Sequence, residues 1–451
     1  MTLLDIVRCP KCGSGMTEDT EVLSCADCSA VYPLYGGIPW LYRDVASSRS
    51  QWADKLQHLD RTTSSEVEQL KAALQQPGLM ASTQERIESL IEGKKKLAGE
   101  IHSLLQPFEL EKSEAARRLP RDRIPSKQHL SSYLETIFRD WVWGDEEVRE
   151  SMALVESHLG PTQRSGSALV LGGGAGRLSY ELSRLGEWQN VVQLDINPLL
   201  TRAGDLLSAG KEVLLTEIPY PPAGLNNVTV DHILKNPNPN PNPSAEPSLH
   251  FLVGDVFAPP FVSESFDVLI TPWFVDILPE DFRSLSRRLN QLLRQGGLWI
   301  NFGPLSFESL PLAAQYTREE VEDALAESGM ALVSSENRQV RYLQSPHGMH
   351  KRSEEILVFG ATKKESADAG AEFSYYPRWM SDPTRSVPLL PAWQQMQSQR
   401  AFDVEILSLI DGRASIQDIV KRLSSKYSLP ADRCRNVVNR FFSTIFEKGL
   451  E

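Results

Sequence analysis

The chain has 451 residues, of which 41% are hydrophobic and 24% are charged, so it is long enough for about three domains of roughly 150 residues. Its formal net charge of −12 argues against nucleic-acid partners, because binding to phosphates requires a basic surface. No segment approaches the ~20 consecutive apolar residues of a membrane helix, and the N-terminus lacks the pattern of a signal peptide. We therefore expect a cytoplasmic protein with no membrane partner.

Residues 1–45 contain four of the five cysteines, arranged as two CxxC pairs. Each pair can present two thiolates from one tight turn, which is typical of a tetrahedral zinc site, with free thiols or a degenerate site as the alternatives. The expected zinc ligands are Cys9, Cys12, Cys25 and Cys28. Because four thiolates close the coordination sphere, this zinc would be structural.

Residues 50–128 are charged and have leucines and isoleucines at helical spacing, which predicts a helical connector. Pro77 and Gly78 divide this connector into two helices. The basic, proline-containing stretch Arg117–Lys127 has the composition of a linker or hinge. A further helical stretch, Leu130–His158, leads into the central domain.

The central domain, residues 129–363, contains short apolar runs that alternate with helical segments from Ser167 onward. This alternation predicts an α/β fold, a doubly wound Rossmann-like parallel sheet with helices on both faces. The predicted strands are Ala168–Leu171, Val191–Leu194, Leu249–Val253, Phe266–Ile270 and Leu298–Phe302. The Asn-Pro alternation of residues 236–243 predicts a loop, because proline removes a donor and disfavours helix in the preceding residue.

A glycine-rich turn follows the first of these strands and precedes a predicted helix, Arg177–Leu185. Glycines let the backbone turn tightly and approach a ligand closely, and a carboxylate after the second strand can accept both ribose hydroxyls of an adenosine-type cofactor. A third strand ends at an aspartate that could hold the adenine amino group. The expected cofactor residues are Gly172, Gly174, Gly176, Arg177, Asp195, Asp255 and Val256.

The spacing GxGxxG of dinucleotide-binding loops is absent, which favours S-adenosylmethionine as the cofactor. The order of strands, with Gly296–Gly297 opening the fifth, resembles class I methyltransferases. A nucleotide-binding domain for another cofactor is the alternative.

The segment Gly296–Leu305 resembles the carnosine N-methyltransferase family, which has a Gly-Gly-x-Trp-Ile-Asn-Leu-Gly-Pro-Leu stretch at this place. The resemblance includes Phe138–Trp141, Thr271–Asp276 and Tyr316–Val321, and it spans roughly residues 130–363. It implies an S-adenosylmethionine-dependent N-methyltransferase that acts on an imidazole or another nitrogen of a small molecule or peptide.

In that family the aspartate matching Asp276 contacts the substrate imidazole, so the resemblance implies Asp276 as a catalytic and substrate-binding residue. Its carboxylate could orient one ring N–H and leave the other nitrogen as the nucleophile. The alternative is that Asp276 caps a helix beginning near Pro279.

Two departures from the family make carnosine itself a doubtful substrate. Phe307 and Glu308, which we expect at the substrate site, stand where the family has a tyrosine and a histidine. Arg352–Glu354 replaces a tyrosine cluster before the last strand. His347 and His350 lie in the preceding loop, where histidines are usually solvated, and we assign them no role.

The two ends of the chain resemble other families. Leu4–Arg8 and Tyr32–Pro39 resemble Trm112-like zinc-ribbon proteins, which often activate methyltransferases as partners. After a linker at residues 364–400, residues 401–451 form three predicted helices of a small helical or winged-helix module. This module resembles PqqD-like domains, which often bind the leader of a ribosomally made peptide as an added strand. A plain winged-helix or dimerisation tail is the alternative.

The leading hypothesis is therefore a methyltransferase that uses S-adenosylmethionine and contains structural zinc. A narrower alternative is a tailoring enzyme that methylates a precursor peptide recruited by the C-terminal module. A non-catalytic adaptor that binds through its zinc ribbon and tail is the rival from another class, although an adaptor would not need the glycine turn and Asp195.

Overall fold

The computed structural model describes residues 2–110, 124–125, 129–160, 163–239, 248–368, 370, 373–377, 380, 384–389 and 391–447. The chain divides into two compact units, Met1–Tyr375 and Tyr376–Glu451. Among the described residues, no helix is both long enough and apolar enough to cross a membrane.

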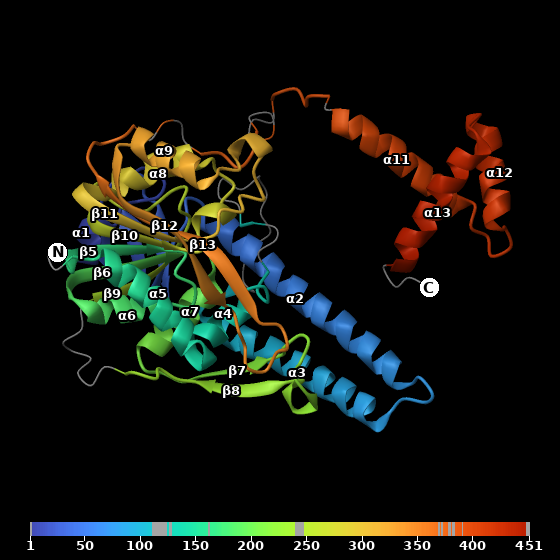
Figure 1. The fold of residues 1–451 in the computed structure, drawn as a ribbon, viewed down its shortest axis with the longest axis horizontal. Helices are drawn as coiled ribbons and strands as arrows, with labels where there is room; N and C mark the ends of the chain where they lie inside the picture. Colours follow the sequence, from blue (N-terminus) through green and yellow to red (C-terminus); the bar gives the residue numbers. More distant parts are fainter. Residues whose placement is uncertain are drawn as a thin grey trace. The chain divides into compact units, whose positions relative to one another are not determined.

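The first unit is built on a central sheet whose seven main strands have the order β9-β6-β5-β10-β11-β13-β12 (Figure 1). These strands are β5 (Ser165–Leu171), β6 (Glu187–Asp195), β9 (Ser248–Gly254), β10 (Phe266–Pro272), β11 (Leu293–Gly303), β12 (Met330–Tyr342) and β13 (Arg352–Lys363). Neighbouring strands pair in parallel, except that β13 is antiparallel to both of its neighbours. All five predicted strands are present.

The direction in which the chain crosses the sheet reverses between β5 and β10. From β5 the chain continues through β6 to β9 on one side, and it then returns to β10 and β11 on the other. In open sheets of this kind, ligands bind at such a switch point, in the crevice outside the carboxyl ends of the strands. The topology therefore places the candidate site after β5 and β10.

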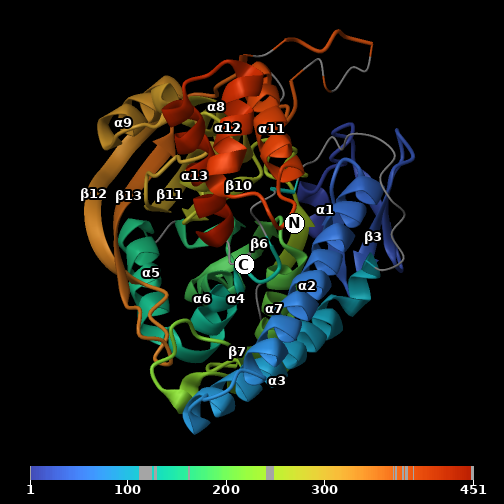
Figure 2. The ribbon, with the colours of Figure 1, turned by 90° about the vertical axis from the view of Figure 1, so that its right-hand side faces the viewer.

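Helices cover both faces of the sheet, as predicted (Figures 1 and 2). The helices are α5 (Asp145–His158), α6 (Arg177–Leu185), α7 (Pro198–Ser208), α8 (Phe282–Leu292) and α9 (Arg318–Glu327). Ala168 and Val170 of β5 pack in one hydrophobic cluster with residues of α5 and α6, whereas Leu169 and Leu171 pack in another with residues of α8 and α9. Alternate side chains of a strand point to opposite faces, so β5 contributes to both halves of the core.

The N-terminal strands continue the central sheet. They are β1 (Met16–Asp19), β2 (Val22–Cys25), β3 (Val31–Tyr35) and β4 (Ile38–Leu41), preceded by α1 (Leu3–Ile6). β4 pairs in parallel with β9, through Trp40 with Val253 and Leu41 with Gly254. A backbone hydrogen bond also joins the N-terminal segment to the loop after β9: the carbonyl of Ile6 accepts from the N–H of Val262 (2.8 Å). The N-terminal segment is therefore part of the first unit's core.

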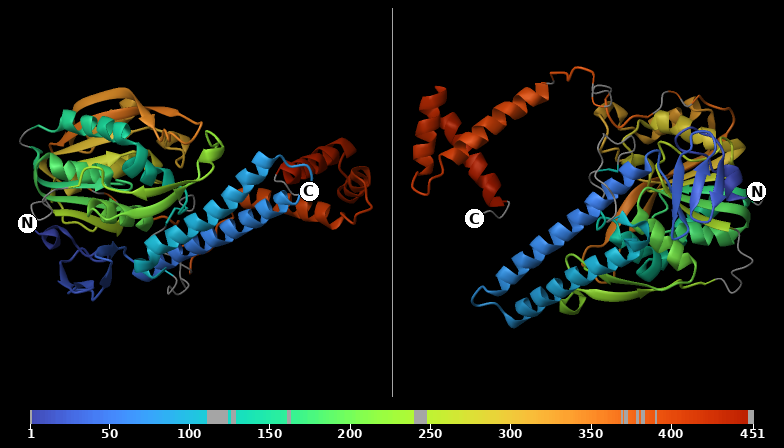
Figure 3. Two further views of the ribbon diagram at one scale, coloured as in Figure 1. Left: turned by 90° about the horizontal axis from the view of Figure 1, so that it is seen from below. Right: turned by 180° about the vertical axis from the view of Figure 1, so that it is seen from behind.

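The predicted helical connector consists of two long antiparallel helices, α2 (Val45–Leu74) and α3 (Ala81–Leu105), which lie side by side in Figure 3. They are separated at Pro77 and Gly78, as expected, and Gly78 has a φ of 81°. Lys94 pairs with Glu66 (2.8 Å) between them. Of the predicted linker 117–127, only residues 124–125 are described.

A separate two-stranded antiparallel sheet, β7 (Val213–Glu217) and β8 (Val230–Leu234), lies between α7 and β9 in the chain. It packs against α3, where Glu100 accepts a hydrogen bond from the N–H of Thr216 (2.7 Å). Of the Asn-Pro segment that follows, residues 236–239 are described, and residues 240–243 lie outside the described residues.

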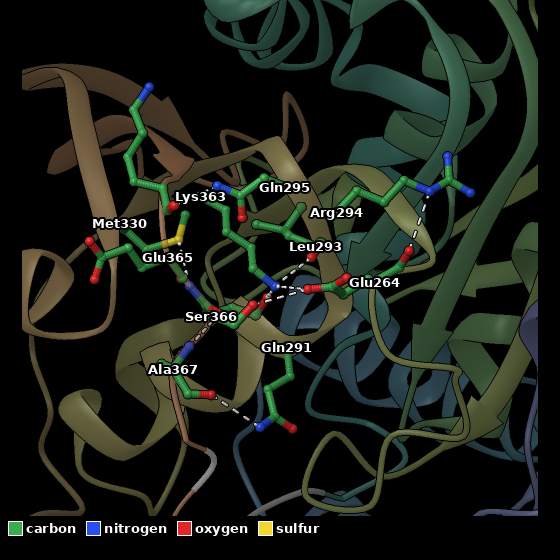
Figure 4. Close-up of polar contacts among 12 residues, drawn as sticks. Glu264, Gln291, Leu293, Arg294, Gln295, Met330, Lys363, Glu365, Ser366 and Ala367 are labelled. Atoms are coloured by element: carbon green, nitrogen blue, oxygen red, sulfur yellow. Dashed lines mark hydrogen bonds and ion pairs between the residues drawn. The ribbon is translucent and has the colours of Figure 1, made fainter.

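A buried lysine fixes the C-terminal end of α8 (Figure 4). Lys363, at the end of β13, is only 1% exposed, and its Nζ donates to the carbonyls of Asn290 (3.0 Å) and Leu293 (2.9 Å). It also pairs with Glu264 (2.9 Å). The last carbonyls of a helix lack partners within it and attract a cation, so this lysine joins α8 to the sheet.

The second unit is helical. Its helices are α11 (Pro391–Ser408), α12 (Ile416–Tyr427) and α13 (Ala431–Glu447). Their core consists of Ile406, Ile419, Val420, Leu423, Cys434 and Val438. The predicted helices of this module are present, and among its described residues there is no strand. Helix α11 begins at Pro391, within the stretch that we expected to be a linker.

Candidate active site

A cavity of about 680 Å³ opens at the carboxyl ends of the parallel strands, where the switch point predicts it. Loops after β5, β6, β9, β10 and β11 all contribute to its wall. The lining includes Gly172, Gly174, Asp195, Asp255, Val256, Asp276 and Glu308 from the predicted set. The volume lies within the range of about 300–1,000 Å³ that is usual for small-molecule sites.

The glycine turn after β5 requires glycine at the positions that line this cavity. Gly172 and Gly174 have φ values of 67° and 61°, which residues with a Cβ rarely adopt. A Cβ on Gly172 would lie 2.4 Å from the ring of Phe274, and one on Gly174 would lie 2.9 Å from Cγ2 of Thr136. The turn therefore brings bare backbone to the cavity wall.

Two members of the predicted cofactor set lie behind this wall and are not among the residues that line it. Gly176 precedes α6, and its Cβ would lie 2.6 Å from the ring of Phe251. Arg177 is buried, its Nε donates to Glu181 (2.7 Å), and its guanidinium lies 5.3 Å from the ring centroid of Trp141. These contacts indicate that Arg177 fixes the segment before α5 instead of reaching the cavity.

Two buried aspartates stand at the carboxyl ends of neighbouring strands: Asp195 is the last residue of β6, and Asp255 directly follows β9. Asp195 accepts a hydrogen bond from the N–H of Asn197 (2.8 Å), and burial raises the pKa of its carboxyl to about 6. Asp255 accepts from the N–H of Phe257 (2.9 Å) and from the hydroxyl of Tyr375 (3.1 Å). Tyr375 also lines the cavity, and nothing in its sequence context predicts this role.

Asp276 lies in a short 3-10 helix, Val275–Ile277, and is 3% exposed. Its Oδ2 accepts hydrogen bonds from the hydroxyl (2.6 Å) and the N–H (3.3 Å) of Ser306, whereas its buried Oδ1 has no hydrogen-bond partner among the described residues. Burial raises the pKa of Asp276, and the nearby Glu308 carboxylate acts in the same direction. The N-cap of α8 is Asp281, so the helix-cap alternative for Asp276 is wrong.

The two residues expected beside Asp276 differ in their placement. Glu308 lines the cavity. Phe307 is fully buried and packs in the hydrophobic core, with its ring centroid 6.3 Å from that of Phe282 and 6.1 Å from that of Tyr316. Because the ring of Phe307 packs in the core and this residue does not line the cavity, any effect of Phe307 on a substrate would be indirect.

Sequence reasoning missed a group of cavity residues that precede β5. Arg139 and Asp140 lie in a π-helical turn, Arg139–Trp143, and form an ion pair of 2.7 Å. Oδ2 of Asp140 is buried and has no partner among the described residues. Both residues line the cavity and belong to the segment Phe138–Trp141. The resemblance of this segment to the family is the feature of the sequence that could have identified them.

An aromatic pair closes another part of the cavity wall. Trp273, after β10, packs on Tyr342, the last residue of β12, with ring centroids 4.1 Å apart. Trp273 belongs to the Thr271–Asp276 segment of the family resemblance, but nothing local in the sequence marks Tyr342.

The four N-terminal cysteines converge. Sγ of Cys9 lies 3.6 Å from that of Cys28, and Sγ of Cys12 lies 3.4 Å from that of Cys25. All four sulfur atoms lie within 4.8 Å of one another. Tetrahedral zinc with bonds of about 2.3 Å holds its sulfur ligands about 3.8 Å apart, so the arrangement suits this metal.

Comparisons with known proteins agree with this geometry. The carnosine N-methyltransferase family model matches residues 119–365, and the model of coenzyme PQQ synthesis protein D (PqqD) matches residues 404–450. The search of curated proteins finds no match.

Among solved structures, an S-adenosylmethionine-dependent methyltransferase from Methanosarcina mazei aligns at 14% identity, with a TM-score of 0.32, over 47% of this chain and 97% of that one. Phosphoethanolamine N-methyltransferase 2 of Haemonchus contortus, in complex with S-adenosylmethionine, aligns at 14% identity with a TM-score of 0.34. That alignment covers 52% of this chain and 59% of the other.

The first family model covers more than half of the chain and includes the glycine turn, both buried aspartates and Asp276. The chain therefore belongs to the carnosine N-methyltransferase family and is an S-adenosylmethionine-dependent N-methyltransferase.

Proposed function

We propose that this enzyme methylates an imidazole or another nitrogen of a small molecule or peptide, and that Asp276 binds the acceptor. The observation that carries the proposal is that Asp276 lines the cavity and that its buried Oδ1 has no hydrogen-bond partner among the described residues. A buried polar atom without a partner is costly, and an N–H of the acceptor would satisfy it.

The cofactor residues fit S-adenosylmethionine. We infer that the backbone of Gly172 and Gly174 approaches the cofactor, that Asp195 accepts its ribose hydroxyls, and that Asp255 and Val256 border its adenine. The ion pair of Arg139 and Asp140 offers both charges to the amino-acid end of the cofactor, where the free Oδ2 of Asp140 can accept an ammonium N–H.

The bound cofactor supplies a methyl group on a positively charged sulfur. In an in-line transfer, the lone pair of the acceptor nitrogen forms the new N–C bond as the C–S bond breaks. Asp276 would accept the N–H of the opposite ring nitrogen, which leaves the attacking nitrogen unprotonated, and would take that proton after transfer. Because burial raises the pKa of Asp276, its carboxylate is a better base than an exposed one.

Two further assignments belong to this proposal. The converging thiolates of Cys9, Cys12, Cys25 and Cys28 support a structural zinc ion. The PqqD match at residues 404–450 supports a peptide acceptor, recruited by the second unit for methylation by the first.

The test is methyl transfer from labelled S-adenosylmethionine to histidine-containing dipeptides, longer histidine peptides and simple amines. Asp276→Asn should lower kcat/KM by about 10²- to 10⁴-fold, the usual contribution of a general base, with unchanged cofactor affinity. The matched control is Asp281→Asn, which makes the same chemical change at the cap of α8 and should leave turnover intact. Wild-type turnover by Asp276→Asn would contradict the proposal.

A further inference from the structure

Three potential metal ligands converge outside the cavity, on the β7–β8 sheet. They are Glu217 at the end of β7, His232 in β8 and His347 in the loop between β12 and β13. One ligand atom from each lies within 4.8 Å of the other two. Nε2 of His232 lies 2.8 Å from Oε2 of Glu217, and the two imidazole ring centroids are 5.5 Å apart.

The strand register puts Glu217 and His232 on the buried face of the small sheet. His232 is the cross-strand partner of Leu215, which lies two residues before Glu217. Residues two apart on a strand share a face, and Leu215 is 1% exposed while Glu217 is 3% exposed. A carboxylate and an imidazole are therefore held on a face that is otherwise apolar.

Other side chains hold the potential ligands in place. The hydroxyl of Ser345 donates to Oε1 of Glu217 (2.5 Å), which leaves Oε2 directed at His232. Nδ2 of Asn227 donates a hydrogen bond to Nδ1 of His347 (3.1 Å), which holds the orientation of this ring.

The charge balance of the group also favours a cation. Within the described part of the chain, the ion pair of Glu217 is formed with His232 and not with a lysine or arginine. A buried carboxylate needs a compensating charge, and a metal ion bound by these three side chains would supply it.

We propose that Glu217, His232 and His347 bind a divalent transition-metal ion, and that zinc is the best match. Two imidazoles and one carboxylate form a common donor set of zinc sites with an open coordination position, which water would fill. Tetrahedral zinc bonds of about 2.0–2.2 Å hold the ligand atoms about 3.3 Å apart. The Glu217–His232 pair, now at 2.8 Å, would open slightly to admit the ion, and the third ligand atom already lies within 4.8 Å of both. The proposal does not depend on which acceptor the enzyme methylates.

Glu217 and His232 lie on the paired strands β7 and β8, whereas His347 lies in a loop much later in the sequence, so the metal would tie this loop to the small sheet. The loop that contains His347 follows Tyr342, whose ring packs on Trp273 in the cavity wall. The carbonyl of His347 already accepts a hydrogen bond from the N–H of Ala223 (2.8 Å) in the β7–β8 connection. A bound ion would therefore fix the loop next to one wall of the cavity.

The experiment measures metal content in the full-length protein. The chain is stripped of metal, reloaded with zinc, dialysed and analysed by mass spectrometry, as wild type and as His347→Gln, Glu217→Gln and His350→Gln. We expect His347→Gln and Glu217→Gln to contain one equivalent less than wild type. His350→Gln, the matched control in the same loop at an exposed position, should retain the wild-type content.

Cobalt distinguishes this site from the cysteine cluster. Cobalt bound by thiolates gives intense charge-transfer absorption, whereas a site of imidazoles and carboxylate gives only weaker visible bands. His347→Gln should remove the weaker bands and leave the thiolate absorption unchanged. Equal metal content in wild type and both ligand variants, each with wild-type circular dichroism, would overturn the proposal.

Discussion

The N-terminal and C-terminal segments flank the methyltransferase core in the sequence, but they differ in how they relate to it. Strands β1 to β4 extend the central sheet, and Leu41 approaches Gly254 so closely that a Cβ there would lie 2.8 Å from the Leu41 carbonyl oxygen. The C-terminal helices have a hydrophobic core of their own in a separate compact unit. A segment that donates a strand shares the stability of the sheet, whereas one with its own core can unfold alone.

This difference has a consequence for the candidate site. Gly254, which β4 contacts, immediately precedes Asp255 in the cavity wall. The N-terminal strands therefore support one part of the cofactor site directly. The methyltransferase chemistry should depend on the N-terminal segment even though none of the cysteines lines the cavity.

The largest effect should come from removal of the proposed zinc. Structural zinc contributes about 10–16 kcal/mol of apparent binding free energy in zinc-finger peptides. Cys12→Ser with Cys25→Ser should therefore lower the unfolding free energy of the first unit strongly and weaken binding of S-adenosylmethionine. Chemical denaturation followed by tryptophan fluorescence, with calorimetry for the cofactor, measures both. Unchanged cofactor affinity in this variant would contradict the link from β4 to the site.

One core substitution in each unit should show whether the two units unfold independently. Trp40 is fully buried, and its Nε1 donates to the hydroxyl of Ser48 (2.8 Å), so Trp40→Ala should cost about 3–5 kcal/mol. Leu423 is equally buried in the C-terminal core, so Leu423→Ala should lower the unfolding free energy of the second unit by about 2–5 kcal/mol. Each change should shift only its own unfolding transition in denaturant. A single transition that both changes shift would show that the units unfold together.

Much of the fold could be predicted because its signals are local. Consecutive residues specify the glycine turn and the helix Arg177–Leu185, and the helix has the predicted bounds in the structure. The start of α11 was also readable, because proline favours the first turn of a helix, but the composition around Pro391 indicated a linker. The pairing of β4 with β9 joins residues more than two hundred positions apart, and no local pattern specifies it.

The candidate site could be predicted in part for the same reason. Asp195 and Asp255 follow apolar strands, a pattern that places them at the carboxyl edge of a parallel sheet. Tyr342 and Tyr375 reach the cavity only through tertiary folding. Phe307 stands at a position that the family uses for substrate, but its side chain packs in the core, which a linear motif does not reveal.

A smaller effect should appear in the pH dependence of cofactor binding, which we assign to the first unit alone. Burial raises the pKa of Asp195 to about 6 in the free protein, and ribose hydroxyls bind its ionised form better. The affinity for S-adenosylmethionine should therefore fall by about tenfold from pH 7 to pH 5, as Asp195 gains a proton. Asp195→Asn should bind weakly with little pH dependence. Calorimetry at several pH values is the measurement, and a flat wild-type profile would contradict the assignment.

The smallest effect should follow removal of the whole C-terminal unit. Because the first unit ends at Tyr375 and contains all the described residues that line the cavity, a chain of residues 1–375 should keep its cofactor affinity within about twofold. Turnover of a free small acceptor should also be unchanged. If the second unit recruits a peptide, KM for that peptide should rise in the truncated enzyme while kcat stays the same. Equal KM values for the peptide in both enzymes would leave methylation to the first unit but contradict recruitment by the second.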